Sequence, residues 1–123
     1  MTTYNNMVVR QQDDVDRVFA ALADATRRDI VARVMREEAS VSALADRYAM
    51  SFAAVQKHVA VLERAGLVRK ESRGRERIVR GDVSTIRAAA RLLEQFEEIW
   101  RGRFGRLEDL LSDDPGPRPG DPR

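Results

Sequence analysis

SFAAVQKHVAVLERAG, residues 51–66, has the pattern of one amphipathic helix with defined ends. Ser51 is a favoured N-cap residue, because its hydroxyl can accept a backbone N–H of the first turn. Gly66 is a favoured stop, because glycine adopts the left-handed conformation without strain. Val55, Val59 and Leu62 recur at i, i+4 and i+7, which predicts a buried apolar stripe between these two ends.

The opposite face of this helix carries small, polar and basic side chains. At 100° per residue it holds Ala53, Lys57, Ala60 and Arg64, with Gln56 on its flank. Small residues let a helix backbone approach DNA base edges, and Gln, Lys and Arg bind bases or phosphates. An ordinary solvated helix has a similar face, so the flanking sequence has to distinguish the two interpretations.

Two further helices are expected immediately before this one. Asp24 is a plausible N-cap for a helix over residues 25–37, and Ser40 or Ser42 can cap a short helix that ends near residue 48. A short helix, a tight connection and a capped helix with a polar outer face form a helix-turn-helix, which favours DNA binding.

The sequence after Gly66 becomes β-prone and basic. Residues 67–68 and 78–79 are expected strands with a turn at Ser72-Arg73-Gly74, which together predict a β-hairpin, or wing. Residues 64–80 hold seven basic side chains against two acidic ones, an excess of +5 where the whole chain has +2. The basic ones are Arg64, Arg69, Lys70, Arg73, Arg75, Arg77 and Arg80. A charged hairpin can be a solvated edge alone, but beside a helix-turn-helix we expect it to bind phosphates.

A long final helix is expected over residues 83–112, with Asp82 as its cap. A helix of ~30 residues is ~45 Å long, more than a domain of this size can cover, so we expect a homodimer in which this helix packs on its twin and on a first helix beginning at Asp13 or Asp14. The expected interface residues are Val15, Val18, Phe19, Leu22, Leu93, Phe96, Trp100, Phe104, Leu107 and Leu111. The alternative is a helix folded back on its own core or broken at Gly102 and Gly105.

The composition limits the class of protein. The chain has 123 residues, which suits one domain: a flexible arm over 1–12, a mainly α domain with a small β-hairpin wing over 13–112, and a disordered tail over 113–123. With no Cys and one His it offers no thiolate or multi-His metal site, and no catalytic spacing supports an enzyme or a cofactor. It has no bilayer-spanning run and no signal core, so a cytoplasmic location is expected.

Two longer runs resemble a known family. They are ALADATRRDIVARV, residues 21–34, and SVSALADRYAMSFAAVQKHVAVLERAGLVRKESRGRERIVR, residues 40–80. Together they strongly resemble the ArsR/SmtB winged-helix repressors over about residues 13–112. The resemblance implies a dimeric repressor of a two-fold symmetric operator. It also implies that Ser51, Ala53, Ala54, Gln56, Lys57 and His58 lie on the DNA-facing helix and Arg73, Arg75 and Arg77 on the wing.

The chain departs from the metal-sensing members of that family. Those members carry two cysteines in the segment that here covers residues 39–44, where Ser40 and Ser42 stand instead. Serine hydroxyls are poor ligands for soft or borderline metals, and the last expected helix has no His. We therefore expect a subgroup without these metal sites, and the sequence names no inducer.

The expected function is a sequence-specific transcriptional regulator, a repressor that can include its own gene among its targets, binding double-stranded DNA as a homodimer. The alternatives are a helical protein-interaction module and a ligand-responsive sensor of the same fold. His58 also has two interpretations: a local hydrogen bond that supports the helix, or contact with a DNA phosphate.

Overall fold

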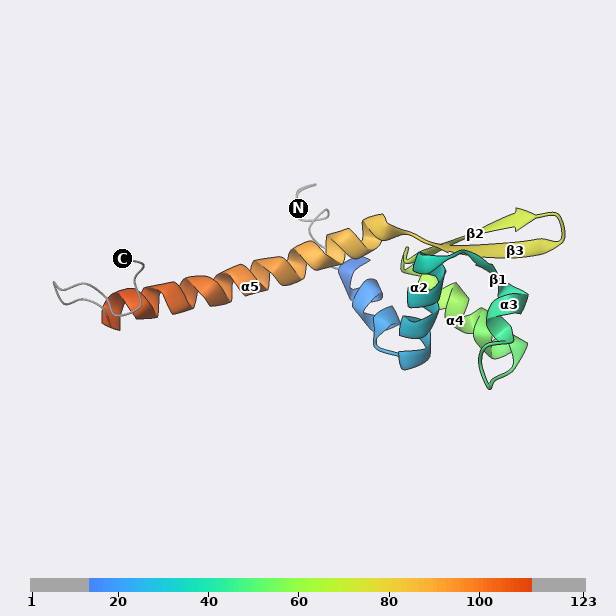
Figure 1. Ribbon diagram of the computed structural model, residues 1–123, viewed down its shortest axis with the longest axis horizontal. Helices are drawn as coiled ribbons and strands as arrows, with labels where there is room; N and C mark the ends of the chain where they lie inside the picture. Colours follow the sequence, from blue (N-terminus) through green and yellow to red (C-terminus); the bar gives the residue numbers. More distant parts are fainter. Residues whose placement is uncertain (1–13, 112–123) are drawn as a thin grey trace, which may run out of the picture. The chain divides into compact units, whose positions relative to one another are not determined.

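The computed structural model describes residues 14–111, without the side chains of Phe104 and Leu107. The expected arm (1–12) and tail (113–123) therefore lie outside the described residues. The chain divides into two compact units, one ending at Ala89 and the other starting at Ala90. Helix α5 (Val83–Leu111) contributes residues to both units (Figure 1).

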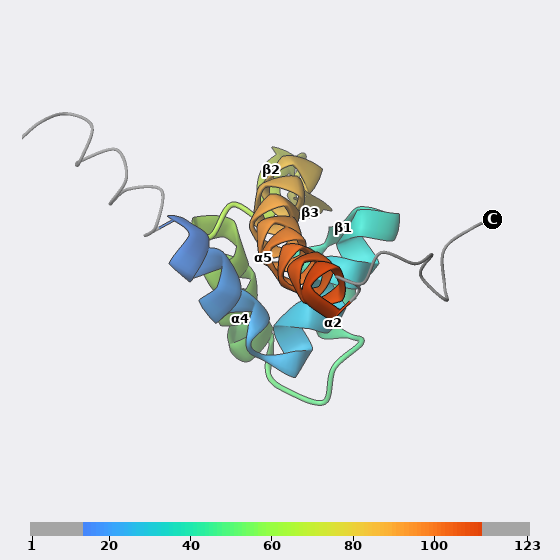
Figure 2. The same cartoon turned by 90° about the vertical axis from the view of Figure 1, so that its left-hand side faces the viewer.

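Four helical segments of the first unit precede its wing. They are residues 14–22, α2 (Ala25–Arg36), α3 (Val41–Ala45) and α4 (Phe52–Arg64). The first segment lies beside α4 in Figure 2, and both line one surface hollow. The expected caps are confirmed: Asp24 accepts the Arg27 N–H at 3.0 Å, and Ser51 Oγ accepts the Ala54 N–H at 3.1 Å.

The end of α4 is a Schellman motif. Gly66 has φ +79°, its N–H donates to the Glu63 carbonyl at 3.0 Å, and the Leu67 N–H donates to the Leu62 carbonyl at 3.0 Å. The predicted glycine stop is confirmed, because only a left-handed residue turns the chain sharply enough to make both bonds.

Helix α3 is shorter than predicted. It ends at Ala45, and the next backbone bonds join Arg47 to Leu44 and Tyr48 to Ala45, a three-residue spacing that does not continue an α-helix. The Tyr48 hydroxyl donates to Asp29 at 2.6 Å. Burial, and next this hydrogen bond to Asp29, raise the pKa of Tyr48 to about 12.

The sheet has three antiparallel strands in the order β1-β3-β2: β1 (Ala39–Ser40), β2 (Val68–Arg73) and β3 (Glu76–Gly81). The two-residue β1 was not predicted, since it is too short to show alternation. The hairpin turn lies farther along the chain than the predicted residues 72–74. Arg73 pairs with Glu76, so the turn is Gly74-Arg75, with Gly74 at φ +62° as hairpins with glycine first prefer.

One apolar core holds the first unit together. Val55, Val59 and Leu62 of α4 are each 0% exposed, which confirms the predicted stripe. Val18 was expected at a dimer interface, but it is only 5% exposed within a single chain. It belongs to the protomer's own core, because the first helix turns Val18 and Ala21 inward and leaves Phe19 outside.

The second unit presents an apolar stripe along α5. The helix runs unbroken through Gly102 and Gly105, so the alternative of a broken helix is wrong. Its large exposed hydrophobic residues are Leu93, Phe96, Ile99, Trp100, Leu110 and Leu111, each more than half exposed. Within the described part of the chain, no helix is long and apolar enough to cross a membrane.

Ser40, and not Ser42, caps α3, which gives a matched pair of variants. Ser40 Oγ accepts the Ala43 N–H at 3.0 Å, whereas Ser42 is exposed. We expect Ser40→Ala to lower the free energy of unfolding by about 1 kcal/mol, and Ser42→Ala to change it much less. Urea unfolding followed by circular dichroism measures both. Equal losses from the two variants would contradict the capping role.

Candidate nucleic-acid interface

The outer face of α4 has the chemistry expected of a DNA-reading helix. Ser51, Ala53, Gln56 and Lys57 are exposed, Ala54 is half-buried, and the first turn holds no acidic residue. Over residues 14–111, neither Gln56 nor Lys57 has a hydrogen-bond or ion-pair partner. Their amide and ammonium groups are therefore available to a ligand.

Arg64 lies apart from this group. It is exposed in the last turn of α4, twelve positions after Phe52, which corresponds to ~18 Å along the axis. A side chain at that distance is unsuited to the base edges that Ser51–Lys57 would contact. The residues predicted to bind DNA from α4 are therefore not one cluster: Arg64 lies at the opposite end of the helix from Ser51–Lys57.

Of the three arginines predicted to bind DNA from the wing, two are unpaired within the described residues and one is neutralised. Arg75 and Arg77 are exposed, and no described residue forms an ion pair with either. Arg73 instead forms a bidentate ion pair with Glu38, with Nη2 donating to Oε1 at 3.1 Å, and its Nε donates to Glu71 at 3.1 Å. The Arg73 guanidinium lowers the pKa of Glu38, and Glu38 in turn raises the pKa of Arg73.

The same pairing holds for most of the basic window. Arg69 lies 2.9 Å from Asp82, Lys70 3.7 Å from Glu63, and Arg80 3.6 Å from Glu71. Three of the carboxylates involved, Glu38, Glu63 and Asp82, lie outside residues 64–80 in sequence. They reduce the local excess from +5 to +2, so the counted window overstated the free positive charge.

His58 turns toward α2. Its Nδ1 lies 3.4 Å from Arg27 Nη1 and 3.9 Å from Asp24 Oδ2, and the side chain is 22% exposed. Asp24 is the cap of α2, and its pKa is lowered chiefly by the Arg27 backbone N–H. This geometry favours local support of the helix packing over the phosphate-contact interpretation.

The structure also adds a residue that the sequence reasoning passed over. Phe52, the first residue of α4, is 47% exposed. The sequence does show an aromatic residue directly after the N-cap Ser51, but Phe52 does not belong to the small, polar and basic face that was predicted to bind DNA.

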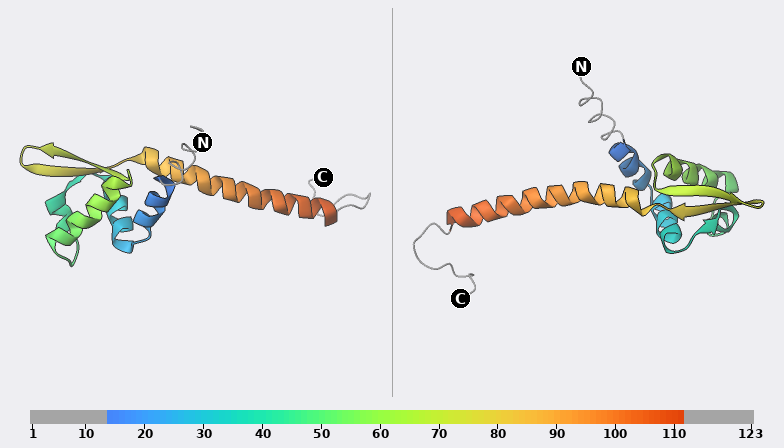
Figure 3. Two further views of the ribbon diagram at one scale, coloured as in Figure 1. Left: turned by 180° about the vertical axis from the view of Figure 1, so that it is seen from behind. Right: turned by 90° about the horizontal axis from the view of Figure 1, so that it is seen from above.

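The first turns of α4 and the tip of the wing lie at the same end of the first unit. Both views in Figures 1 and 3 show the hairpin turn projecting beyond the helices at the end where α3 and the start of α4 lie. We call the following exposed residues of these two elements the α4–wing surface: Ser51, Phe52, Ala53, Gln56, Lys57, Arg75 and Arg77. It combines a helix edge without acidic groups with free cations on a projecting hairpin.

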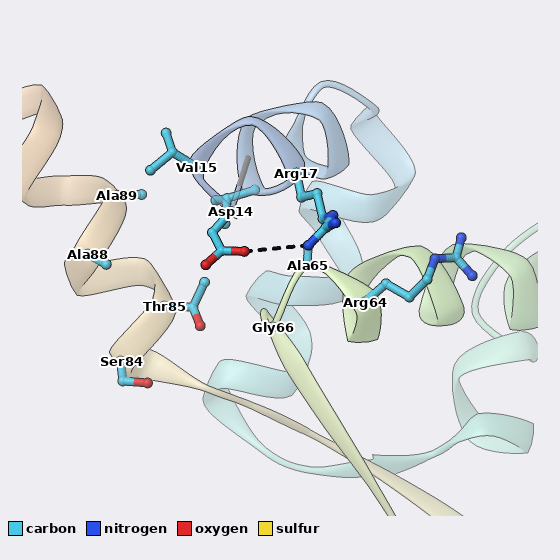
Figure 4. A pocket seen from close by; sticks show the side chains of 11 residues that line it. Asp14, Val15, Arg17, Arg64, Ala65, Gly66, Ser84, Thr85, Ala88 and Ala89 are labelled. Carbon is cyan, nitrogen blue, oxygen red and sulfur yellow. Dashed lines mark hydrogen bonds and ion pairs between the residues drawn. The ribbon is translucent and has the colours of Figure 1, made fainter. Parts of the chain in front are cut away.

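A separate cavity of ≈ 380 Å³ lies between the first helix, the end of α4 and the start of α5 (Figure 4). Val15, Ala65 and Ala88 contribute apolar walls, while Arg64 is directed away from its centre. A β-carbon on Gly66 would lie 3.1 Å from Thr85 Oγ1, so the end of α4 and the start of α5 are in close contact.

Comparisons with known proteins agree with this architecture. A helix-turn-helix domain family matches residues 22–71. The HTH-type transcriptional regulator Rv2034 of Mycobacterium tuberculosis is 34% identical over 99 residues, which are 80% of this chain and 92% of the relative.

Solved structures give the same result. An ArsR-like transcriptional regulator from Rhodococcus sp. RHA1 superposes with a TM-score of 0.71 at 33% identity, over 80% of this chain and 93% of that one. The homodimeric winged helix-turn-helix DNA-binding domain of Mb0332 from Mycobacterium bovis shares the fold, with a TM-score of 0.62 at 23% identity over 80% of this chain and 89% of that one. The identity and coverage of the first two relatives show that this chain belongs to the ArsR family and is a DNA-binding transcriptional regulator with a winged helix-turn-helix fold.

Proposed function

We propose that the protein is a repressor that binds a two-fold symmetric operator as a homodimer. The observation that carries the proposal is the α4–wing surface, where Gln56, Lys57, Arg75 and Arg77 are exposed and have no partner among residues 14–111. A protein-interaction module would not need unpaired cations beside a helix edge free of carboxylates.

Each part of this surface has a distinct contact in the proposal. The first turns of α4 enter the major groove, where Gln56 suits adenine and Lys57 suits guanine. Arg75 and Arg77 bind phosphates or the adjacent minor groove, and Arg64 reaches a phosphate farther along the backbone. A second protomer reads the next half-site about one helical turn, ~34 Å, away.

The homodimer is supported by the apolar stripe of α5. Phe96 is 58% exposed and Trp100 53% exposed, and large contiguous apolar surfaces of this kind usually mark an interface. Phe19 of the first helix, 37% exposed, would join them, whereas Val18 is excluded by its burial. The Mb0332 domain, which shares the fold, is itself homodimeric.

Selection of bound sequences from a random DNA pool tests the proposal directly. We expect an inverted repeat with half-sites one helical turn apart. If the dimer neutralises roughly eight phosphates, the logarithm of affinity falls against the logarithm of salt concentration with a slope near −7. A single asymmetric motif would contradict the symmetric operator, and an affinity independent of salt would contradict the phosphate contacts.

Replacing Gln56 separates base reading from backbone contact. We expect Gln56→Ala to cost ~1–3 kcal/mol on the preferred sequence and to relax base preference at one position in each half-site. Competition binding with operators carrying all four bases at each position measures this. Uniform weakening on every sequence would instead make Gln56 a backbone contact.

The cavity beside Gly66 favours a second candidate, a repressor that releases DNA when a small molecule binds. Its volume, ≈ 380 Å³, is within the range of small-molecule sites, and it touches the last turn of α4. Thermal-shift screening against metabolites and metal ions tests this candidate. Ala88→Phe, which fills the cavity, should abolish any shift, whereas Ala90→Phe, outside its lining, should preserve it.

A further inference from the structure

Phe52 is exposed at the start of α4, whereas the nearby Met50 is partly buried. Met50, two residues earlier, packs against the core, whereas the Phe52 side chain is 47% exposed and is not part of that packing. Keeping a phenyl ring in water forgoes the stabilisation that burial of a Phe side chain gives. The ring therefore offers apolar surface that a partner of α4 can cover.

Its position in the helix aims that surface at the proposed DNA site. Phe52 is the first residue after the Ser51 cap, and side chains in a helix lean toward the N-terminus. The ring therefore projects at the leading end of α4. Gln56 follows at i+4, so the two side chains are neighbours on one face, and the first turn has no acidic residue to repel DNA.

The major groove presents one apolar group at its base edges, the C5-methyl of thymine. A phenyl ring cannot replace the hydrogen bonds of the other bases, so over those it would leave polar edges unsatisfied. We infer that Phe52 selects thymine through its methyl group, at a base pair next to the one that Gln56 reads. This inference rests on the proposed function, and it adds a specificity-determining residue to it.

Replacing thymine by deoxyuridine tests the inference, because the change removes the methyl and keeps every hydrogen-bonding group. The experiment uses the full chain and an operator obtained from the random pool, with each thymine replaced in turn. Loss of one buried methyl corresponds to about a fourfold weaker affinity per half-site, and hence roughly fifteenfold when both half-sites are changed. We expect this loss at one symmetric thymine pair for the natural protein and no loss there for Phe52→Ala.

Two controls keep the result interpretable. Val83→Ala trims another exposed apolar side chain, 48% exposed, at the start of α5, and it should retain the full response to deoxyuridine. Phe52→Leu should retain part of the response, since leucine also covers a methyl, and circular dichroism confirms that each variant is folded. An unchanged affinity for every deoxyuridine operator would overturn the inference while leaving specific DNA binding intact.

Two further results would also overturn it. Phe52→Ala could respond to deoxyuridine as strongly as the natural protein, which would assign thymine recognition to another residue. Alternatively, Phe52→Ala could weaken all sequences equally, which would make the ring a non-specific contact. Absence of any sequence preference in the natural protein would overturn the proposed function itself, and it is recognised before any variant is made.

Discussion

Phe96→Glu combined with Trp100→Glu is expected to produce monomers that no longer bind the operator tightly. Both side chains are more than half exposed on the α5 stripe, so the isolated chain tolerates the change. In a dimer that buries this stripe, each new carboxylate would be taken out of water among apolar side chains, which is costly for an unpaired charge.

The loss of DNA affinity follows from the loss of pairing. A dimer binds its second half-site at the high effective concentration set by the first, which typically strengthens binding by 10²–10⁴-fold. We therefore expect the monomeric variant to bind the full operator roughly 10²–10⁴-fold more weakly. Sedimentation equilibrium and gel shift measure the two effects separately.

Arg87→Glu combined with Arg91→Glu is the matched control. It places two carboxylates four residues apart on the same exposed helix, and both positions are rotated away from Trp100 by more than a right angle. This control should remain dimeric. If the Phe96 and Trp100 variant also stayed dimeric, the interface would lie elsewhere. If it became monomeric without losing operator affinity, one protomer would suffice for binding.

Features of the fold that depend on neighbouring residues were predictable from the sequence. The caps at Asp24 and Ser51 and the stop at Gly66 were correct, because each is made by a side chain or backbone bond within five residues. The stripe of α4 was correct for a related reason: periodicity alone decides which face of a regular helix is buried.

Features that depend on distant parts of the chain were missed or misplaced. Strand β1 exists because Ala39 and Ser40 pair with Val79 and Ile78, about forty residues away. A strand of two residues is too short for a local sequence pattern to predict this pairing. Val18 was assigned to the dimer interface for a similar reason. An apolar stripe on a helix does not show whether the core of the same protomer or a partner protomer buries it.

The helix and the hairpin that carry the candidate site were predicted correctly, but the electrostatics of the hairpin were misjudged. The reading helix and the wing were correctly placed next to each other in sequence, but a count of charges could not show that Glu38, 35 positions before Arg73, neutralises it. The structure therefore divides the three predicted wing arginines into one that is paired within the fold and two that have no partner among residues 14–111, and this division has a measurable consequence.

Arg75→Ala combined with Arg77→Ala is expected to remove most of the contribution of the wing to DNA binding. A homodimer loses four cations that have no partner within the described chain. About 0.9 counterions are released per phosphate contact. The slope of the logarithm of affinity against the logarithm of salt concentration should therefore become shallower, from near −7 to about −3.5. At ~0.1 M salt, affinity should weaken by roughly 10³–10⁴-fold on every sequence, because phosphate contacts carry no base preference.

Comparison of Arg73→Ala with Arg75→Ala tests the reason for this result, since both variants remove one arginine from the same hairpin. Arg73 is already neutralised by Glu38 and Glu71, so a phosphate would have to displace two carboxylates to bind it. Arg73→Ala should therefore leave the salt slope nearly unchanged, whereas Arg75→Ala should reduce it by about 1.8 in a dimer. Equal reductions would mean that the Glu38 ion pair opens on DNA and that all three wing arginines bind phosphate. The two slopes thus decide whether the Arg73 ion pair is part of the folded wing or a contact exchanged when DNA binds.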